Sequence, residues 1–527
     1  MKKTARQYWA LLLALVMISA VCFMFSGRKS GMFIDEIYSY GLANSSYAPF
    51  LDDIKGGDMV GKTFTRAELL DYVSVMGSES VDFGSVYYNQ ANDVHPPLYY
   101  WLLNIASAIN HDGFTKWTGL ILDYIIYILA ILVLYKLVLT LGGSRENAAA
   151  SAVLYGLSVI GMSTMLMIRM YVLMMLLTLC LALEIAELIR DFRPAICILV
   201  GITLLAGLFT QYYFVFYAFF LCASYVLYAL IKKQYRALAW FIPCALIGAL
   251  LLIPLFPACI SQLFSGELVS GNSAMDNLKN PSIYAFRFKR FFIEFVYHGM
   301  KAAVYTGVVL VIALAVRFRA LCAAVKEKRL NCSALVIILP AFIVLPLVAV
   351  MSPVDEPRYI YNIIPIFVLA VSFLIYLLEN SLGEIKNERT VKCGAMLLIM
   401  ALALWEARCT PPDYLYPEYA EYDAIIAEYA DAPCVYFSDN KFEGLTQDLL
   451  QLLQFDDFYV TDKEHVSALT DYAGDAEKVV AYIDISVFWS SGYDTDEILS
   501  LAATQTDYVN SELLYQNGLS ATYLLYR

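Results

Sequence analysis

Residues 117–141 read WTGLILDYIIYILAILVLYKLVLTL, a run of 25 residues with one acidic and one basic side chain. A helix of that length, rising about 1.5 Å per residue, crosses a hydrocarbon core roughly 30 Å thick. Residues 359–378 form a similar run. Of all 527 residues, 60% are hydrophobic and 16% are charged, and the mean hydropathy is +0.61. This composition excludes a soluble globular protein and predicts a polytopic α-helical membrane protein.

Charge is distributed unevenly along the chain. Residues 410–527 hold 22 acidic and 4 basic side chains, a net charge of −18. Residues 1–409 hold 26 acidic and 32 basic side chains, a net charge of +6. We therefore expect a membrane domain over 1–409 and a separate acidic domain over 410–527. Because an acidic domain repels phosphates, nucleic acid is not expected as a partner.

The distribution of basic residues predicts the topology. Lys2, Lys3 and Arg6 precede an apolar run at 8–25 that lacks a signal-peptide cleavage site, which predicts an uncleaved anchor with a cytoplasmic N-terminus. Five more basic clusters lie at Arg145, at Arg190 and Arg193, at Lys232 to Arg236, at Arg317 to Arg329 and at Lys386 to Lys392. If all five are cytoplasmic, about eleven spans follow, at 8–25, 117–141, 148–167, 171–189, 194–208, 212–231, 237–260, 302–316, 334–350, 359–378 and 391–408.

This topology places the long polar segments outside the cell. The first outer loop covers about 27–116, the second covers about 261–300, and the acidic domain follows the last span. Leu98–Ile109 is too short for a comfortable span and is expected to lie along the outer interface or to re-enter the membrane. We expect a multi-pass protein of a bacterial plasma membrane, with the lipid bilayer as its surroundings.

The acidic domain has the pattern of a small α/β fold. Strands are predicted at Cys434–Phe437 and Val479–Ile485, and a helix at Gly444–Gln454. Asn517-Gly518, between alternating apolar residues, predicts a closing hairpin. The fold class is therefore a helical polytopic membrane protein with a small extracytoplasmic α/β domain.

Two adjacent carboxylates follow the first apolar run. They are Asp35 and Glu36 in FIDEIYS at 33–39, about ten residues beyond the anchor. An acid pair beside a membrane can deprotonate an acceptor hydroxyl or amine. The alternative interpretation is a solvated acid pair on a loop.

Two further motifs contain a basic side chain. His95 lies in DVHPPLYY at 93–100, where adjacent prolines rigidify a helix start and could hold the histidine toward the membrane surface; alternatively, the histidine is incidental. Arg169 lies in MIRMY at 167–171, between two apolar runs. An arginine in such a place is energetically costly, and its forked donors suit a lipid phosphate; the alternative is snorkelling to the interface.

Arg358, in DEPRY at 355–359, adds a second arginine on the same predicted face of the membrane. Together with the acids, the two arginines indicate a site for an anionic lipid-linked ligand. The sequence has no P-loop, dinucleotide-binding glycine motif, H-E-x-x-H or G-x-S-x-G, so ATP, nicotinamide and serine-hydrolase chemistry lack support. No cofactor is expected; a divalent metal is compatible with the sequence but is not indicated by it. A disulfide joining Cys409 to Cys434 is an open alternative.

In this order, the four motifs resemble those of the GT-C class of polytopic glycosyltransferases, near the protein O-mannosyltransferases and the lipid A aminoarabinose transferases. The resemblance covers about residues 8–378. It implies a GT-C-like fold and the inverting transfer of a hexosyl or pentosyl group from a polyprenyl-phosphate donor. The acceptor would be an extracytoplasmic protein, cell-wall polymer or lipid.

The resemblance also implies roles for individual residues. Asp35 would be the general base, and Glu36 would help to position it. The donor phosphate would be bound by Arg169 and Arg358, and the cavity would be lined by His95, Tyr171, Gln211 and Tyr359. The chain departs from the pattern at Gln211, where many relatives carry a histidine before the aromatic pair, so no acid–base or metal role is expected there.

Two other classes of function compete with the enzyme. A transporter or flippase for a lipid-linked sugar would use the arginines to bind phosphate without chemistry. Transporters of this kind tend to contain inverted repeats and polar residues at mid-membrane, and the sequence shows neither. A membrane scaffold that displays the acidic domain would leave Asp35 and Arg169 without a role.

Overall fold

The computed structural model describes residues 2–76, 81–110, 113–264, 275–326, 331–382, 387–486 and 492–527. Part of the second predicted outer loop, 265–274, lies outside the described residues. The chain divides into two compact units. The first unit comprises Met1–Gly27, Val94–Tyr99 and Leu120–Asp413, and the second comprises Arg28–Asp93, Tyr100–Gly119 and Tyr414–Arg527.

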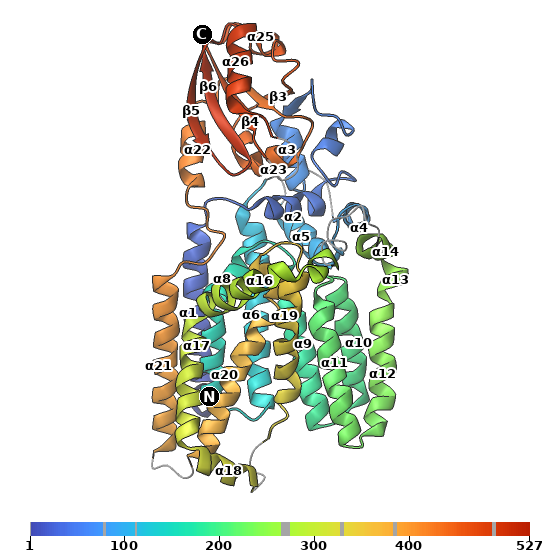
Figure 1. Cartoon of the computed structure of the whole chain (residues 1–527), viewed down its shortest axis with the longest axis vertical. Helices are drawn as coiled ribbons and strands as arrows, with labels where there is room; N and C mark the ends of the chain where they lie inside the picture. The colour runs from blue at the N-terminus through green and yellow to red at the C-terminus, as the bar shows by residue number, and fades with distance from the viewer. Residues whose placement is uncertain are drawn as a thin grey trace. The chain divides into compact units, whose positions relative to one another are not determined.

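The first unit consists of helices and their connections (Figure 1). Its longer helices are α1 (Lys2–Arg28), α6 (Lys116–Thr140), α9 (Tyr171–Arg190), α11 (Phe214–Ile231), α12 (Tyr235–Leu250), α20 (Ile364–Ser381) and α21 (Glu388–Cys409). The shorter ones are α7 (Arg145–Gly156), α8 (Val159–Leu166), α10 (Pro194–Leu208), α13 (Leu252–Leu255), α14 (Ala258–Phe264), α16 (Tyr284–Lys289), α17 (Lys301–Val316), α18 (Phe318–Lys326) and α19 (Leu335–Met351). Turns of 3₁₀- or π-helix lie at η2 (Pro281–Ile283), η3 (Arg290–Tyr297) and η4 (Pro357–Ile360).

The multi-pass helical fold is confirmed, but the count of about eleven spans is not. Among the described residues, seven helices are long and apolar enough to cross a membrane, or up to nine if each of two bent pairs is one span. One pair is α7 with α8, bent by 62°, and the other is Pro281–Tyr297 with α17, bent by 91°. The first bend lies within the apolar run at 148–167. There α7 ends at Gly156, and Ser158 caps α8 by accepting a hydrogen bond from the Gly161 amide at 3.1 Å.

Small residues bring α10 and α12 into close contact. A Cβ atom on Gly201 would lie 2.6 Å from the Cys244 carbonyl oxygen, and one on Gly248 would overlap the Gly201 backbone. The hydrophobic effect does not drive helices together in lipid, so the attraction comes from close van der Waals packing of the backbones. The glycines thus hold this helix pair together.

The second unit is built around a six-stranded sheet of order β1-β3-β2-β4-β6-β5 (Figure 1). The strands β3, β2 and β4 are parallel, and the remaining pairs are antiparallel. The strands are β1 (Thr63–Thr65), β2 (Cys434–Phe437), β3 (Asp457–Thr461), β4 (Lys478–Asp484), β5 (Asn510–Gln516) and β6 (Ser520–Tyr526). The helices are α2 (Ile34–Asn44), η1 (Asp52–Lys55), α3 (Arg66–Val73), α4 (Phe83–Ala91), α5 (Leu98–Ile109), α22 (Tyr419–Ala427), α23 (Glu443–Gln447), α24 (Leu449–Leu452), α25 (Ala468–Ala473) and α26 (Thr495–Gln505).

The local predictions for the acidic segment are largely confirmed. Both predicted strands form, and β5 and β6 make the hairpin at Asn517, whose side-chain oxygen accepts hydrogen bonds from the Leu519 and Ser520 amides at 2.8 Å. The prediction of one helix over 444–454 is wrong. The helix is interrupted at Asp448, a fully buried side chain that accepts hydrogen bonds from the Tyr436 hydroxyl at 3.1 Å and the Asn517 amide at 2.7 Å.

One strand of this sheet comes from the N-terminal part of the chain. Residues Thr63–Thr65 pair antiparallel with Asp457–Thr461, and Phe64 stacks on Phe458 at 5.3 Å between ring centroids. Buried apolar side chains of β2 and β4, among them Val435, Phe437 and Val479, form the core beneath the sheet. The segment predicted as the first outer loop is therefore part of the second unit's fold.

Candidate functional site

The acidic pair of the sequence lies in the first turn of α2, in the second unit. The Glu36 carboxylate accepts a hydrogen bond from the Phe33 amide at 2.8 Å and binds the Lys29 ammonium at 2.9 Å. The Lys29 and Glu36 side chains are both fully buried. Lys29 also donates to the Tyr414 carbonyl at 2.6 Å. The Glu36 carboxylate thus caps the start of α2 and forms a buried ion pair.

Asp35 has a different environment from its neighbour. Its side chain is half-buried, and its backbone carbonyl accepts a hydrogen bond from the Ser39 hydroxyl at 2.9 Å. The N-terminus of α2 favours a carboxylate there through the helix dipole. The rigid turn made by Glu36 therefore presents Asp35 as the more accessible acid of the pair.

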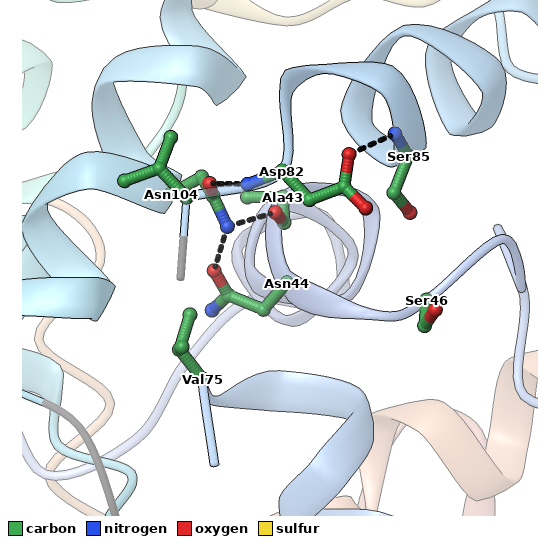
Figure 2. Close-up of a pocket in the computed structure, with 8 residues that line it drawn as sticks. Ala43, Asn44, Ser46, Val75, Asp82, Ser85 and Asn104 are labelled. Atoms are coloured by element: carbon green, nitrogen blue, oxygen red, sulfur yellow. Dashed lines mark hydrogen bonds between the residues drawn. The ribbon is translucent and has the colours of Figure 1, made fainter. Parts of the chain in front are cut away.

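A polar pocket of about 220 Å³ lies at the other end of α2 (Figure 2). The Asn104 side chain donates to the Ala43 carbonyl at 2.9 Å and accepts from the Asp82 amide at 3.1 Å. Its lining residues are Ala43, Asn44, Ser46, Val75, Val81, Asp82, Ser85 and Asn104. At about 1.5 Å per residue, Asn44 lies roughly 13 Å along the helix from Asp35, so this pocket is distinct from the acidic pair.

Arg169 lies in the first unit, in the connection that joins α8 to α9. It is 5% exposed, and its amide donates to the Met167 carbonyl at 2.7 Å. Two residues later, Tyr171 begins α9, and its ring lies 6.1 Å from that of Tyr361 in an edge-on contact. Arg169 is thus a buried charged residue on irregular backbone between two apolar helices.

Arg358 and Tyr359 occupy η4, also in the first unit. Arg358 is half-buried, and its guanidinium carbon lies 5.5 Å from the centre of the Tyr359 ring. The Tyr359 ring lies 4.7 Å from the ring of Tyr213, which precedes α11. One aromatic contact thus connects η4 to the start of α11, and the Tyr171 contact connects Tyr361, the residue after η4, to α9.

The segments of His95 and Gln211 also meet within the first unit. The Leu98 amide, three residues after the half-buried His95, donates to the Phe209 carbonyl at 3.0 Å. Gln211, two residues after Phe209, is buried. Its backbone amide donates to the Gly207 carbonyl at 3.0 Å. The residue that follows the two prolines is therefore bonded to the turn that precedes α11.

Sequence reasoning missed Arg287. This residue of α16 is 7% exposed, and its Nε lies 3.1 Å from an oxygen of Asp355, three residues before Arg358. Its signal in the sequence was the group Arg287, Lys289 and Arg290 on a loop that the charge rule places outside, where basic clusters are unexpected.

The described residues contain no group of three or more His, Cys, Asp or Glu side chains that could hold a metal ion. The expectation of a metal-independent reaction stays a prediction. All eleven cysteines are free thiols, so the alternative of a disulfide between Cys409 and Cys434 is wrong.

The fold defines a multi-pass membrane protein with a second, sheet-containing unit. A family model described as dolichyl-phosphate-mannose-protein mannosyltransferase matches residues 94–260. This match includes His95, Arg169, Tyr171 and Gln211, and it confirms the predicted resemblance to the polytopic glycosyltransferases over this part of the chain. Asp35, Glu36, Arg358 and Tyr359 lie outside the matched residues.

Three solved structures are similar to this chain at low identity. ArnT from Cupriavidus metallidurans bound to undecaprenyl phosphate is 12% identical, with 98% of each chain covered and a TM-score of 0.49. The oligosaccharyltransferase AglB from Archaeoglobus fulgidus, in complex with an inhibitory peptide and a dolichol-phosphate, is 14% identical, with 95% of this chain and 72% of that chain covered and a TM-score of 0.46. The arabinofuranosyltransferase AftD from mycobacteria is 13% identical, with 97% and 40% covered and a TM-score of 0.40.

Among curated proteins, no sequence match to the chain is found.

Proposed function

We propose that this protein is an inverting membrane glycosyltransferase that moves a sugar from a polyprenyl-phosphate donor to an extracytoplasmic acceptor. The observation that carries the proposal is Arg169, a buried cation at a break between two apolar helices, within the residues matched by the mannosyltransferase model. A buried arginine among apolar helices is costly and marks the binding of an anion, for which a lipid phosphate is well suited.

The reaction assigns one task to each residue. The Asp35 carboxylate takes the proton from the acceptor hydroxyl or amine, whose electron pair forms the bond to the anomeric carbon of the sugar. The bond from that carbon to the phosphate oxygen breaks, and its electron pair leaves with the polyprenyl phosphate. Arg169 and Arg358 stabilise the negative charge that develops on this phosphate.

Glu36 contributes by holding the turn that presents Asp35, because its own carboxylate is buried against Lys29. His95, Tyr171, Gln211 and Tyr359 line the donor cavity. Gln211 remains neutral at all pH values and therefore binds the sugar or its linkage without transferring a proton.

A reconstituted assay tests the function. Purified protein in detergent or liposomes is incubated with defined polyprenyl-phosphate sugars and candidate acceptors, and the glycosylated product is identified by mass spectrometry. We expect release of polyprenyl phosphate together with an inverted glycosidic bond. Movement of the donor across liposomes, without a product for any donor tested, would instead support the flippase.

The proposed topology has a bacterial plasma membrane, a cytoplasmic N-terminus and the 410–527 segment outside. A tag after Arg527 should then be removed by protease added to spheroplasts, while a cysteine placed at Gly143 should resist an impermeant thiol reagent. The opposite pattern would reverse the proposed orientation.

A further inference from the structure

The last turn of α19 is closed by side chains from elsewhere in the first unit. Arg287 Nη1 donates to the Ser352 carbonyl at 2.5 Å and to its hydroxyl at 3.2 Å, and it lies 3.3 Å from the Val350 carbonyl and 3.4 Å from that of Ala349. The Asn277 side-chain amide donates to the same Ser352 carbonyl at 2.9 Å. The carbonyls that a helix end leaves without backbone donors are thus satisfied mainly by one guanidinium.

The same guanidinium also reaches the segment that follows the helix. Its Nε lies 3.1 Å from Asp355 Oδ1, a charge contact without the alignment of a hydrogen bond. Arg287 therefore holds two points, Ser352 and Asp355, on the short connection that leads into η4. Arg358 lies three residues after Asp355, and Tyr359 follows it directly.

A positively charged group suits this position for two reasons. The C-terminus of a helix carries a partial negative charge, and Asp355 adds a full one. Arginine is preferred over lysine because its planar fork can donate in several fixed directions at once, whereas an ammonium is a point charge on a flexible stem. The exposed Lys289, on the same helix, forms no ion pair with any of the described residues.

We infer that Arg287, with Asp355, is a positioning device that sets the geometry of Arg358 and Tyr359 for the donor phosphate. This inference rests on the proposed glycosyltransferase function. Arg287 itself is buried by the carbonyls of α19, so it acts on the donor through the η4 turn. Misplacing a binding group by about 1 Å can lower a rate by roughly a hundredfold, which gives such a device a large effect.

The test uses Arg287→Lys and Asp355→Asn in the full-length protein, with Lys289→Ala as the matched control. We expect the two variants to raise the donor KM and weaken inhibition by free polyprenyl phosphate, each by about tenfold or more, with the acceptor KM unchanged. Lys289→Ala should behave as wild type. Asp355→Asn retains the carbonyl contacts of Arg287, so it remains informative if Arg287→Lys folds poorly.

The decisive comparison combines these changes with Arg358→Ala. If Arg287 works through Arg358, then adding Arg287→Lys or Asp355→Asn to Arg358→Ala should cause little further loss of polyprenyl-phosphate binding. Multiplicative losses, or wild-type behaviour of both single variants, would overturn the inference. If wild type binds polyprenyl phosphate but transfers no sugar, the proposed function fails, while the binding measurements still decide the role of Arg287.

Discussion

Arg287 in the first unit and Glu36 in the second hold helix ends in opposite ways. Arg287 is a cation at the C-terminus of α19, where it donates to carbonyls and contacts Asp355. Glu36 is an anion at the N-terminus of α2, where it accepts from the Phe33 amide and binds Lys29. Each charge is opposite in sign to the partial charge of the helix end that it faces, so both contacts are favourable.

The two turns share a further property. In each, a buried charged residue bonds to the fold, and a less buried charged residue lies nearby in the chain: Asp35 beside Glu36, and Arg358 three residues after Asp355, which Arg287 contacts. The first turn therefore offers an acid and the second a cation. Under the proposed function, changing the less buried member should affect the reaction, whereas changing the buried member should also affect the structure.

The largest expected effect comes from Asp35→Asn. Asparagine preserves the shape and the favourable position at the start of α2 but cannot accept the acceptor's proton. Sugar transfer should fall by about 10²–10⁴-fold, with polyprenyl-phosphate binding unchanged. Steady-state kinetics and a binding titration measure the two quantities. Full activity in a well-folded variant would remove Asp35 from the mechanism.

Breaking the ion pair beneath Asp35 should lower stability. Lys29→Met leaves the Glu36 carboxylate buried without its cation, and Glu36→Gln leaves Lys29 without its anion. Loss of one partner of a buried pair costs about 3–5 kcal/mol, so the thermal unfolding midpoint should fall clearly in each variant. The double variant should recover part of the loss. Equal midpoints in all four proteins would contradict a structural role for the pair.

Removing the two arginines proposed to bind the donor phosphate should have a smaller effect. Arg169→Ala and Arg358→Ala should each lose roughly 1.5–3 kcal/mol of charge-assisted hydrogen bonding, or about tenfold or more in donor affinity or rate. Lysine at either position should restore only part of it, because it lacks the planar fork. If both alanine variants express normally and transfer sugar at the wild-type rate, the phosphate site lies elsewhere.

Asp484 of the second unit extends the comparison to a buried acid that has no cationic partner among the residues that the structure describes. Burial raises its pKa from 3.8 to about 7, the Ser486 amide opposes this rise, and nearby Asp439, Asp448 and Glu443 add to it. Since the folded state then holds a proton that the unfolded chain has released, stability should fall as pH rises from about 4 to 7, by at most about 1.4 kcal/mol per pH unit.

The control for this pH effect is a neutral side chain of the same shape. Asp484→Asn should flatten the fall of the unfolding midpoint over this range, whereas Asp471→Asn, at an exposed position, should leave it unchanged. Burial also raises the pKa of Asp448, to about 6. The Asp484→Asn variant should therefore still lose some stability as the pH rises. A wild-type midpoint that rises over this pH range would contradict the sign.

The sequence was sufficient for features that depend on local physics. Apolar runs long enough to cross a membrane had to become helices, because lipid offers no partner for backbone polar groups. The α5 helix begins and ends where the pattern predicted, and the hairpin at Asn517-Gly518 follows from turn chemistry. The motifs around Asp35 and Arg169 were also visible, since charges beside apolar runs stand out.

Tertiary structure decided what depends on partners far apart in the chain. Thr63–Thr65 is too short to be recognised as a strand, and it becomes one only because Asp457–Thr461 offers an open edge. The ion pair of Lys29 with Glu36 could be guessed from their closeness in the chain, but its complete burial could not. Arg287 and Asp355 are 68 residues apart in the sequence, and only folding places that guanidinium against the end of α19, where unsatisfied carbonyls require a donor.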